Sequence, residues 1–265
     1  MLGNTNPFPL SVRNMDQRLG NARIKDLIAM KVADRDYSVD KYDFNIKALD
    51  TTNVWTVAAG GTATTWAVRA EAGGWIRGVT GTTTACAALQ IYQPQKYWTG
   101  TAIAGAAFLW RSDVVQGLTI EMGFVDALPA INTTVINNAT TPTFNTSVDV
   151  AMVLYQHSGN ATAAPDRVGL YAANSSAATT QKSVITISTL GDKPGPAAAT
   201  EHFVAIEVNG TGVYAFLGDR VEPLQLSAAV TAANGMVPFF AVKGSNSTSK
   251  NVDLDTVWTW SGRLG

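Results

Sequence analysis

A pair of Asp or Glu side chains could hydrolyse a glycosidic bond, but the spacing of the acidic residues in this chain argues against that chemistry. The reaction needs two carboxyl groups about 5–10 Å apart that face one cleft. Along a strand, only residues at even spacing share a face. Glu121 and Asp126 are five apart and fall on opposite faces of a regular strand, whereas Asp253 and Asp255 share a face but form an isolated pair. We therefore expect no enzymatic activity and assign no catalytic residue.

Residues that could hold a metal ion are present without the spacing that a metal site requires. Protein oxygens that bind Ca²⁺ come from clustered Asp, Asn and carbonyl groups. Asn251, Asp253 and Asp255 are the candidates, but they do not form an Asp-x-Asp-x-Asp-Gly loop. His157 and His202 are far apart in the sequence, and His157 is predicted to be exposed in a loop. Fingerprints for phosphates or dinucleotides are also missing, so the sequence predicts no metal and no cofactor.

Aromatic residues could bind a sugar by stacking on its ring. The adjacent pair Tyr97 and Trp98 lies between Pro94 and Gly100, where a loop would expose it. Both residues also fit a core position, because aromatic side chains are more often buried than exposed. The other strand-borne tryptophans are assigned to the core: Trp55, Trp66, Trp75, Trp110, Trp258 and Trp260.

The elements that must position these residues are strands. The clearest unit is 203–217, where two apolar-alternating runs flank Asn209-Gly210-Thr211-Gly212, a turn sequence suited to a tight hairpin. Further strands are expected at 42–46, 54–57, 65–69, 75–79, 87–92, 106–111, 117–124, 148–155, 168–171, 235–242 and 252–260. Short strands about 8–12 residues apart with turn chemistry between them are typical of a sandwich. We predict an all-β, antiparallel jelly-roll β-sandwich.

Two details of this pattern bear on the site. In the last strand, Val252, Leu254, Trp258 and Trp260 have even spacing and are predicted to point inward together. The Asn- and Thr-rich stretch 126–146 lacks periodicity and is expected to be a long loop or a β-excursion.

Residues 1–40 differ from the sandwich, which is expected to occupy 41–265. They carry six of the nineteen Lys and Arg residues, begin with a Pro-rich stretch, and show helical spacing at Met15, Leu19, Ala22, Leu27 and Met30. We interpret this segment as an arm that docks on a neighbouring protein; the alternative is a helix packed on its own domain. The residues assigned to the docking arm are Pro7, Phe8, Arg13, Arg18, Leu19, Arg23 and Leu27.

Composition narrows the classes of partner. Only 15% of residues are charged, the net charge is −1 and the pI is near 6.1, so electrostatics give no attraction to nucleic acid or to an anionic membrane. The single Cys86 allows no internal disulfide and is expected to be a buried, inert side chain. The N-terminus lacks the charged and apolar regions of a signal peptide, and no apolar run is long enough to span a bilayer.

Over about residues 42–263 the chain resembles the concanavalin A-like (laminin-G-like) jelly roll, in particular the versions in tailed-bacteriophage virion proteins. The residues that carry the resemblance are 74–78, 108–111, 120–126, the hairpin at 206–219 and the closing strand at 253–260. The resemblance implies two back-to-back antiparallel sheets and, in phage, a capsid-decorating, tail or fibre role. Hydrolases of this fold place acidic residues at alternating positions of one strand, and that pattern is missing here.

These observations lead to a main prediction and two alternatives. The main prediction is a non-enzymatic capsid decoration protein that binds the major capsid protein of a phage head through its arm. We expect it to be a homo-oligomer, with a trimer suggested by the symmetry of shells, located on the virion surface after synthesis in the host cytoplasm. The first alternative is a carbohydrate-binding, lectin-like module of a tail or fibre, and the second is a glycan hydrolase.

Overall fold

The computed structural model of the protein describes most of the chain. The described residues are 15–44, 48–60, 64–69, 74–81, 88–93, 97–98, 103–113, 117–127, 134–138, 143–144, 149–157, 167–173, 181–186, 200–209, 212–218, 223–227, 230, 235–244 and 248–262. Cys86 and three of the predicted arm residues, Pro7, Phe8 and Arg13, lie outside them.

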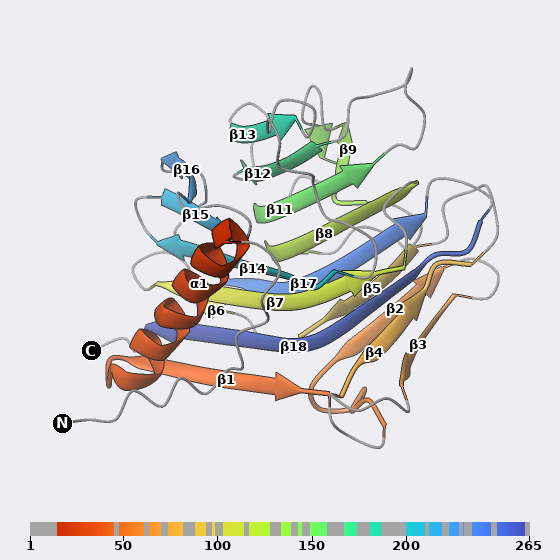
Figure 1. Cartoon of the computed structure of the whole chain (residues 1–265), viewed down its shortest axis with the longest axis horizontal. Helices are drawn as coiled ribbons and strands as arrows, with labels where there is room; N and C mark the ends of the chain where they lie inside the picture. The colour runs from red at the N-terminus through yellow and green to blue at the C-terminus, as the bar shows by residue number, and fades with distance from the viewer. Residues whose placement is uncertain are drawn as a thin grey trace.

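Two antiparallel sheets form the molecule, and they confirm the predicted β-sandwich (Figure 1). Sheet A has the order β16-β15-β14-β7-β18-β4-β3, with β1 paired to β18. Its strands are β16 (Leu224–Ser227), β15 (Gly212–Leu217), β14 (His202–Asn209), β7 (Ala104–Ser112), β18 (Asn251–Gly262), β4 (Ile76–Val79), β3 (Thr65–Val68) and β1 (Tyr37–Asp43). The predicted hairpin is β14–β15, and the Asn209 side chain accepts a hydrogen bond from the Gly212 N–H at 2.8 Å.

Sheet B has the order β13-β12-β11-β8-β17-β5-β2, with β6 paired to β17. Its strands are β13 (Gln181–Thr186), β12 (Arg167–Ala173), β11 (Val150–His157), β8 (Leu118–Val125), β17 (Gly235–Gly244), β5 (Ala88–Tyr92), β2 (Thr56–Gly60) and β6 (Tyr97–Trp98). A separate ribbon of β9 (Ile136–Asn138) and β10 (Thr143–Phe144) lies within the predicted β-excursion.

The main core fills the space between the sheets. Alternate residues of each strand enter it because successive side chains of a strand point to opposite faces. On β7 these are Ala106, Phe108 and Trp110, and on β8 they are Ile120, Met122 and Phe124. Burial of these side chains from both sheets is the main driving force for the fold.

The prediction for the last strand is wrong beyond Leu254. A β-bulge interrupts the β18–β7 register between Leu254 and Thr256. The extra residue reverses which side chains face inward, so Val257 joins Val252 and Leu254 in the main core. Trp258 and Trp260 therefore lie on the outer face of sheet A.

The helix α1 (Met15–Ala33) covers part of that outer face (Figure 1). Ile24 and Ile28 are fully buried against Phe203, Ala205 and Trp260, and Leu27 packs at the margin of this cluster. Burial of such an apolar stripe is what holds a short helix in place, since isolated helices are only marginally stable in water. Within the described residues no helix is long and apolar enough to cross a membrane.

An ion pair fastens the last turn of this helix to sheet A. The Lys31 Nζ lies 3.0 Å from a Glu207 carboxylate oxygen and 4.0 Å from the centre of the Tyr37 ring. The same carboxylate accepts a hydrogen bond from the Trp260 indole N–H at 3.1 Å. Helix and sandwich are therefore packed together, and β1 begins at Tyr37, ahead of the boundary predicted at residue 41.

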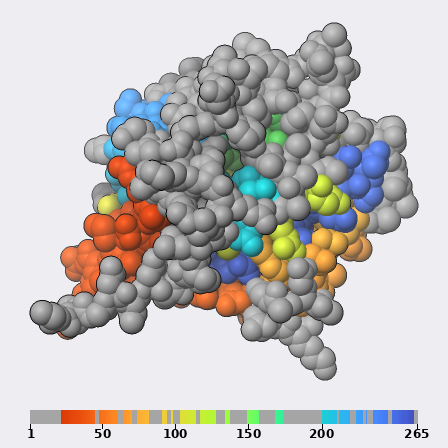
Figure 2. All heavy atoms as spheres, viewed as in Figure 1, coloured from red at the N-terminus to blue at the C-terminus, as the bar shows by residue number. Residues whose placement is uncertain are grey.

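The predicted apolar face of the helix is wrong at Met30, which is 68% exposed. The buried face instead passes through Ile24 and Ile28, four residues apart, and the helix forms part of the molecular surface on its other side (Figure 2). Arg23 is exposed, and the side chains of Arg18 and Leu19 lie outside the described residues.

Candidate functional site

An open groove lies where the edges of the two sheets meet. Its volume is about 360 Å³, which falls in the range of small-molecule sites. β2 is the last strand of sheet B and β3 is the last strand of sheet A, so the groove runs between the two sheet edges. We call it the edge groove; its lining residues are Ala48, Leu49, Thr51, Val57, Trp66, Ala67 and Val68.

Trp66 gives the edge groove its aromatic surface. Its ring meets Phe240 edge-on at 6.1 Å between centroids and lies against the backbone of Gly78. A Cβ at residue 78 would lie 2.9 Å from the Trp66 ring, so glycine is needed for this close approach. The Trp66 indole nitrogen is buried and has no hydrogen-bond partner among the described residues. The groove therefore offers a held aromatic ring.

A polar turn stands beside the groove. The Asp50 carboxylate accepts hydrogen bonds from the backbone N–H groups of Thr52 at 3.0 Å and Asn53 at 2.9 Å. The Asn53 side-chain amide donates to the other carboxylate oxygen at 3.2 Å. The N–H and amide of Asn53 hold the pKa of Asp50 below its usual range, so the carboxylate stays ionised. Because Leu49 and Thr51 line the groove, this turn places exposed hydroxyl, amide and carboxylate groups at its rim.

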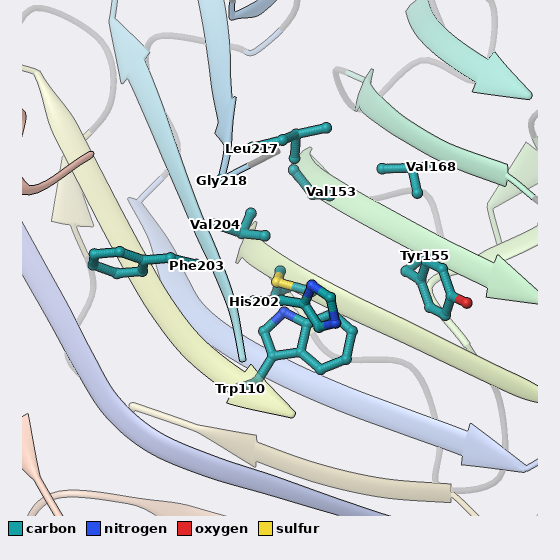
Figure 3. A pocket seen from close by; sticks show the side chains of 10 residues that line it. Trp110, Val153, Tyr155, Val168, His202, Phe203, Val204, Leu217 and Gly218 are labelled. Carbon is teal, nitrogen blue, oxygen red and sulfur yellow. The ribbon is translucent and has the colours of Figure 1, made fainter. Parts of the chain in front are cut away.

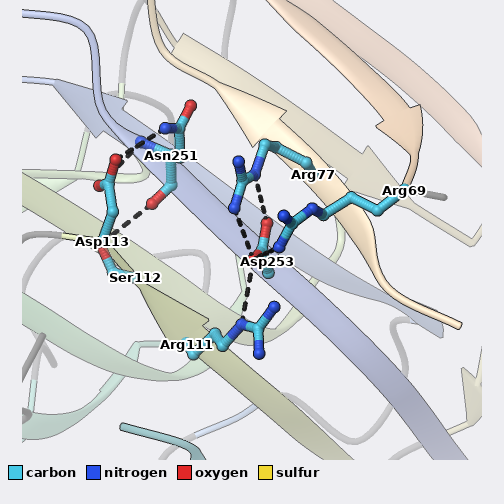
Figure 4. A network of polar contacts seen from close by, with 7 residues as sticks. All are labelled: Arg69, Arg77, Arg111, Ser112, Asp113, Asn251 and Asp253. Atoms are coloured by element: carbon cyan, nitrogen blue, oxygen red, sulfur yellow. Dashed lines mark hydrogen bonds and ion pairs between the residues drawn. The ribbon is translucent and has the colours of Figure 1, made fainter. Parts of the chain in front are cut away.

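A second polar cluster occupies the outer face of sheet A (Figure 4). The buried Asp253 carboxylate contacts Arg77 Nε at 2.7 Å, Arg69 Nη1 at 2.9 Å and Arg111 Nε at 3.0 Å. The Arg111 guanidinium also lies 4.2 Å from the centre of the Trp75 ring. Burial opposes ionisation, but the hydrogen bonds from Arg77 and Arg111 outweigh it and hold the pKa of Asp253 below its usual range.

These arginines change the interpretation of Asp253. A carboxylate surrounded by three guanidinium groups is neutralised by them and is a poor ligand for Ca²⁺. Its bonding is structural, because it ties β18 to β4 and β7 and to Arg69 at the end of β3. Throughout the ranges that the structure describes, no three His, Cys, Asp or Glu side chains are grouped to hold a metal ion.

Replacing Asp253 with asparagine is expected to destabilise the fold by about 3 kcal/mol, because three guanidinium groups lose their counter-charge. Partial hydration of the arginines keeps the loss near the low end for a broken buried pair. The wild type should lose this contribution to stability as the pH falls through the lowered pKa of folded Asp253. Asp253→Asn should not show this loss of stability at low pH. Urea unfolding between pH 3 and 7 measures both effects. Asp40→Asn, an exposed carboxylate on β1, is the control, and equal stability of both variants would contradict the expectation.

Tyr97 is not the exposed sugar contact that was predicted. It is 4% exposed, and its hydroxyl lies 2.8 Å from Thr259 Oγ1 and 3.3 Å from Gln93 Oε1. Burial raises the pKa of this hydroxyl, and the ring packs against Phe124 in the main core. The partner residue Trp98 lies in β6, and its side chain is outside the described residues.

Glu121 is enclosed on the outer face of sheet B. Its two carboxylate oxygens accept hydrogen bonds from the backbone N–H groups of Val135 at 2.7 Å and Ile136 at 2.9 Å, so the excursion lies directly over it. Burial raises the pKa of Glu121 to about 7. Both oxygens are engaged by protein, so Glu121 holds the excursion against sheet B in this conformation.

The two histidines lie in strands. His157 is the last residue of β11 and pairs with Leu118, which contradicts its predicted place in a loop; its side chain is outside the described residues. The His202 ring, at the start of β14, lies 4.8 Å from the Trp110 ring.

Sequence reasoning missed the edge groove because Trp66 fits a core pattern. The residue does pack on the core, yet it is only half-buried because β3 is an edge strand. A signal was available in the polar run Asp50-Thr51-Thr52-Asn53 directly before the strand at 56–60. The folded protein brings this run and Trp66 into one groove, because β2 and β3 are the edge strands of the two stacked sheets.

Comparisons with known proteins identify the fold. No family model matches the chain, and no curated protein matches its sequence. Peanut lectin matches with a TM-score of 0.51 and 13% identity, over 86% of this chain and 99% of that chain. The beta-glucanase of Bacillus licheniformis matches with a TM-score of 0.51 and 12% identity, over 86% and 99%. The carbohydrate recognition domain of Emp47p matches with a TM-score of 0.52 and 8% identity, over 84% and 95%.

At such low identity these matches show the fold alone. The chain has the concanavalin A-like jelly roll that the resemblance implied. The neighbours are lectin domains and a glucanase, and their names give no support to a virion role.

Proposed function

We propose that this protein is a carbohydrate-binding module and that a glycan binds in the edge groove. The observation that carries the proposal is Trp66, whose half-buried ring lines an open groove of suitable volume beside a polar turn. The fold supports the same class, since lectin domains are among its structural neighbours. This reading replaces the capsid decoration role as our leading proposal.

The groove matches the mixed character of a sugar. One face of a pyranose is apolar and can pack on an aromatic ring, while its hydroxyls need donors and acceptors. The Trp66 ring would supply the packing surface for the apolar face. Asp50 would accept from a hydroxyl, because an ionised carboxylate has about four acceptor sites, and the two backbone N–H groups and the Asn53 amide do not fill them.

The proposed ligand is an uncharged glycan. Among the described residues the lining of the groove carries no ionisable side chain, and Asp50 is the charged residue of the adjoining turn. A hydrolytic role has less support, because that chemistry needs two carboxylates across the bound sugar and Glu121 is enclosed by the excursion. Recognition without turnover is therefore the function that we propose.

Titration calorimetry with neutral gluco- and manno-oligosaccharides tests the site. We expect saturable binding that weakens about 10-fold or more in Trp66→Leu, because the aromatic ring is lost. Trp66→Phe keeps a smaller aromatic ring and should lose about 3-fold. The control is Trp258→Phe, because Trp258 is a half-buried tryptophan on the outer face of sheet A, away from the lining of the groove. Full affinity in a folded Trp66→Leu variant would rule out this groove as the site.

A second candidate function keeps the arm as a docking element. Met30 and Val32 on α1 are 68% and 59% exposed, and they are the large apolar side chains exposed among the described residues. Their exposure favours a partner that covers this side of the helix, for which the predicted partner is the major capsid protein of a phage head. A homo-oligomer, with the suggested trimer, is part of that proposal.

The variant Met30→Asp/Val32→Asp separates this candidate from glycan binding. It changes only the outer side of α1, so the contacts of Ile24 and Ile28 with the sandwich are kept. If the arm docks on a head shell, sedimentation with phage particles should be lost while glycan binding stays unchanged. Unchanged sedimentation of the folded variant, or no sedimentation of the wild type, would reject the docking role.

A further inference from the structure

A second pocket lies between the two sheets, at the other side of the sandwich from the edge groove (Figure 3). We call it the interior pocket. Sheet A contributes β7, β14 and β15 to its wall, and sheet B contributes β8, β11 and β12. The side chains that matter for its chemistry are Trp110, Val153, Tyr155, His202, Val204 and Leu217.

Trp110 brings an unsatisfied donor into this pocket. The residue is 1% exposed, and its indole nitrogen has no hydrogen-bond partner in the described part of the chain. A buried donor without an acceptor costs about 1–3 kcal/mol. In Figure 3 the pyrrole edge of Trp110 faces the side of the pocket where His202 and Val204 lie.

The neighbouring rings fix the direction of this N–H. The His202 ring is tilted by 42° at 4.8 Å from the Trp110 ring, and the Tyr155 ring is tilted by 45° at 6.0 Å. The ring therefore cannot turn to another partner without disturbing both contacts. The nearby backbone is already paired, since the Gly218 N–H donates to the Phe203 carbonyl at 2.8 Å.

The size and polarity of the pocket limit what could bind there. The space open to the centres of water-sized atoms is about 30 Å³, whereas a single buried water needs roughly 10–15 Å³. Only an end group of a few heavy atoms fits inside, with the rest of a ligand in the open mouth. Apolar side chains form most of the wall, so a charged group would be poorly solvated.

We propose that the interior pocket binds the end group of a small, neutral, apolar molecule whose carbonyl or ether oxygen accepts a hydrogen bond from the Trp110 indole. The bond would satisfy the buried donor, and the apolar wall would take the adjoining carbons. This site is separate from the edge groove in place and in ligand size, because the interior pocket is too small for a sugar ring.

Two matched probes test the proposal on the intact protein. Butanone and 2-methyl-1-butene have almost the same shape, but only the ketone can accept a hydrogen bond. Binding is followed by ¹⁵N NMR of the seven tryptophan indole N–H signals, and the Trp110 signal is assigned with Trp110→Phe. We expect a saturable downfield shift of the Trp110 signal with butanone and at least fivefold weaker binding of the alkene. Trp110→Phe should remove that preference, and Trp258→Phe should keep it.

Three results would overturn the proposal. The first is a shift with butanone that stays linear and is shared by all indole signals. The second is equal binding of the ketone and the alkene, which would mean apolar filling without the hydrogen bond. The third is no response, as expected if a tightly held water occupies the donor. If Trp110→Phe does not fold, the ketone-to-alkene ratio of the wild type decides alone, because the Trp110 signal can then be assigned from its contacts with His202 and Tyr155.

Discussion

Gly105→Ala is expected to destabilise the protein by about 3 kcal/mol or more, which is a large effect for one methyl group. Gly105 lies on β7 opposite Trp260 of β18, and the Trp260 ring covers the glycine. A Cβ at residue 105 would lie far inside the van der Waals contact distance of three ring atoms. Trp260 cannot move aside, because it is fully buried under α1 and donates a hydrogen bond to Glu207.

A double-mutant cycle in urea measures this steric conflict. Trp260→Val removes the ring and is itself expected to cost about 3–5 kcal/mol. On that background Gly105→Ala should cost less than about 1 kcal/mol, since the space is then open. Equal costs of Gly105→Ala on both backgrounds would contradict the packing of Trp260 on Gly105.

Glu121 is expected to make the protein less stable as the pH rises from about 5 to 7. Burial raises the folded pKa of Glu121 to about 7 from an ordinary value of 4.5. The unfolded chain therefore releases its proton first, so this contribution is fully present below about pH 4.5 and is lost as the pH approaches 7. At 1.36 kcal/mol per pKa unit the loss is about 3 kcal/mol. Burial also raises the pKa of Asp255 to about 6, which adds a change of the same sign.

Glu121→Gln isolates this effect. Its amide nitrogen cannot accept a hydrogen bond, so either the Val135 or the Ile136 N–H loses its acceptor and the variant should lose about 1–3 kcal/mol at pH 5. The pH dependence should shrink, leaving mainly the part from Asp255. Denaturant unfolding from pH 4.5 to 8 measures both, with Asp26→Asn on the exposed face of α1 as the control. A pH profile parallel to that of the wild type would show that Glu121 does not titrate in this range.

The sequence was sufficient to predict the class of fold, because apolar and polar residues alternate strongly along most strands. The β14–β15 hairpin, β7, β8 and β17 follow the predicted ranges within a few residues. The short strands β13 and β16 at the edges were missed. Edge strands bury less of each side chain, so their alternation is weaker.

The errors have a common cause in tertiary packing. The bulge after Leu254 reverses the orientation of Trp258 and Trp260, and a period of two residues cannot reveal an extra residue. Thr259 and Gln93 satisfy the hydroxyl of the buried Tyr97, and Thr259 lies far away in the sequence, so local patterns could not predict this contact.

The candidate site was less predictable than the fold. Trp66 and the turn at Asp50 come from the edges of different sheets and meet only because the sheets stack in one particular register. The buried donors of Trp66 and Trp110 are likewise visible only in three dimensions.

The central claim is that this sandwich recognises an uncharged glycan at Trp66. A glycan array probed with the wild type and with Trp66→Leu, both verified as folded, tests it most directly. The account predicts a restricted set of neutral glycans bound by the wild type and a loss of that set in the variant. Binding to none of the glycans, or the same set bound by both proteins, would contradict it.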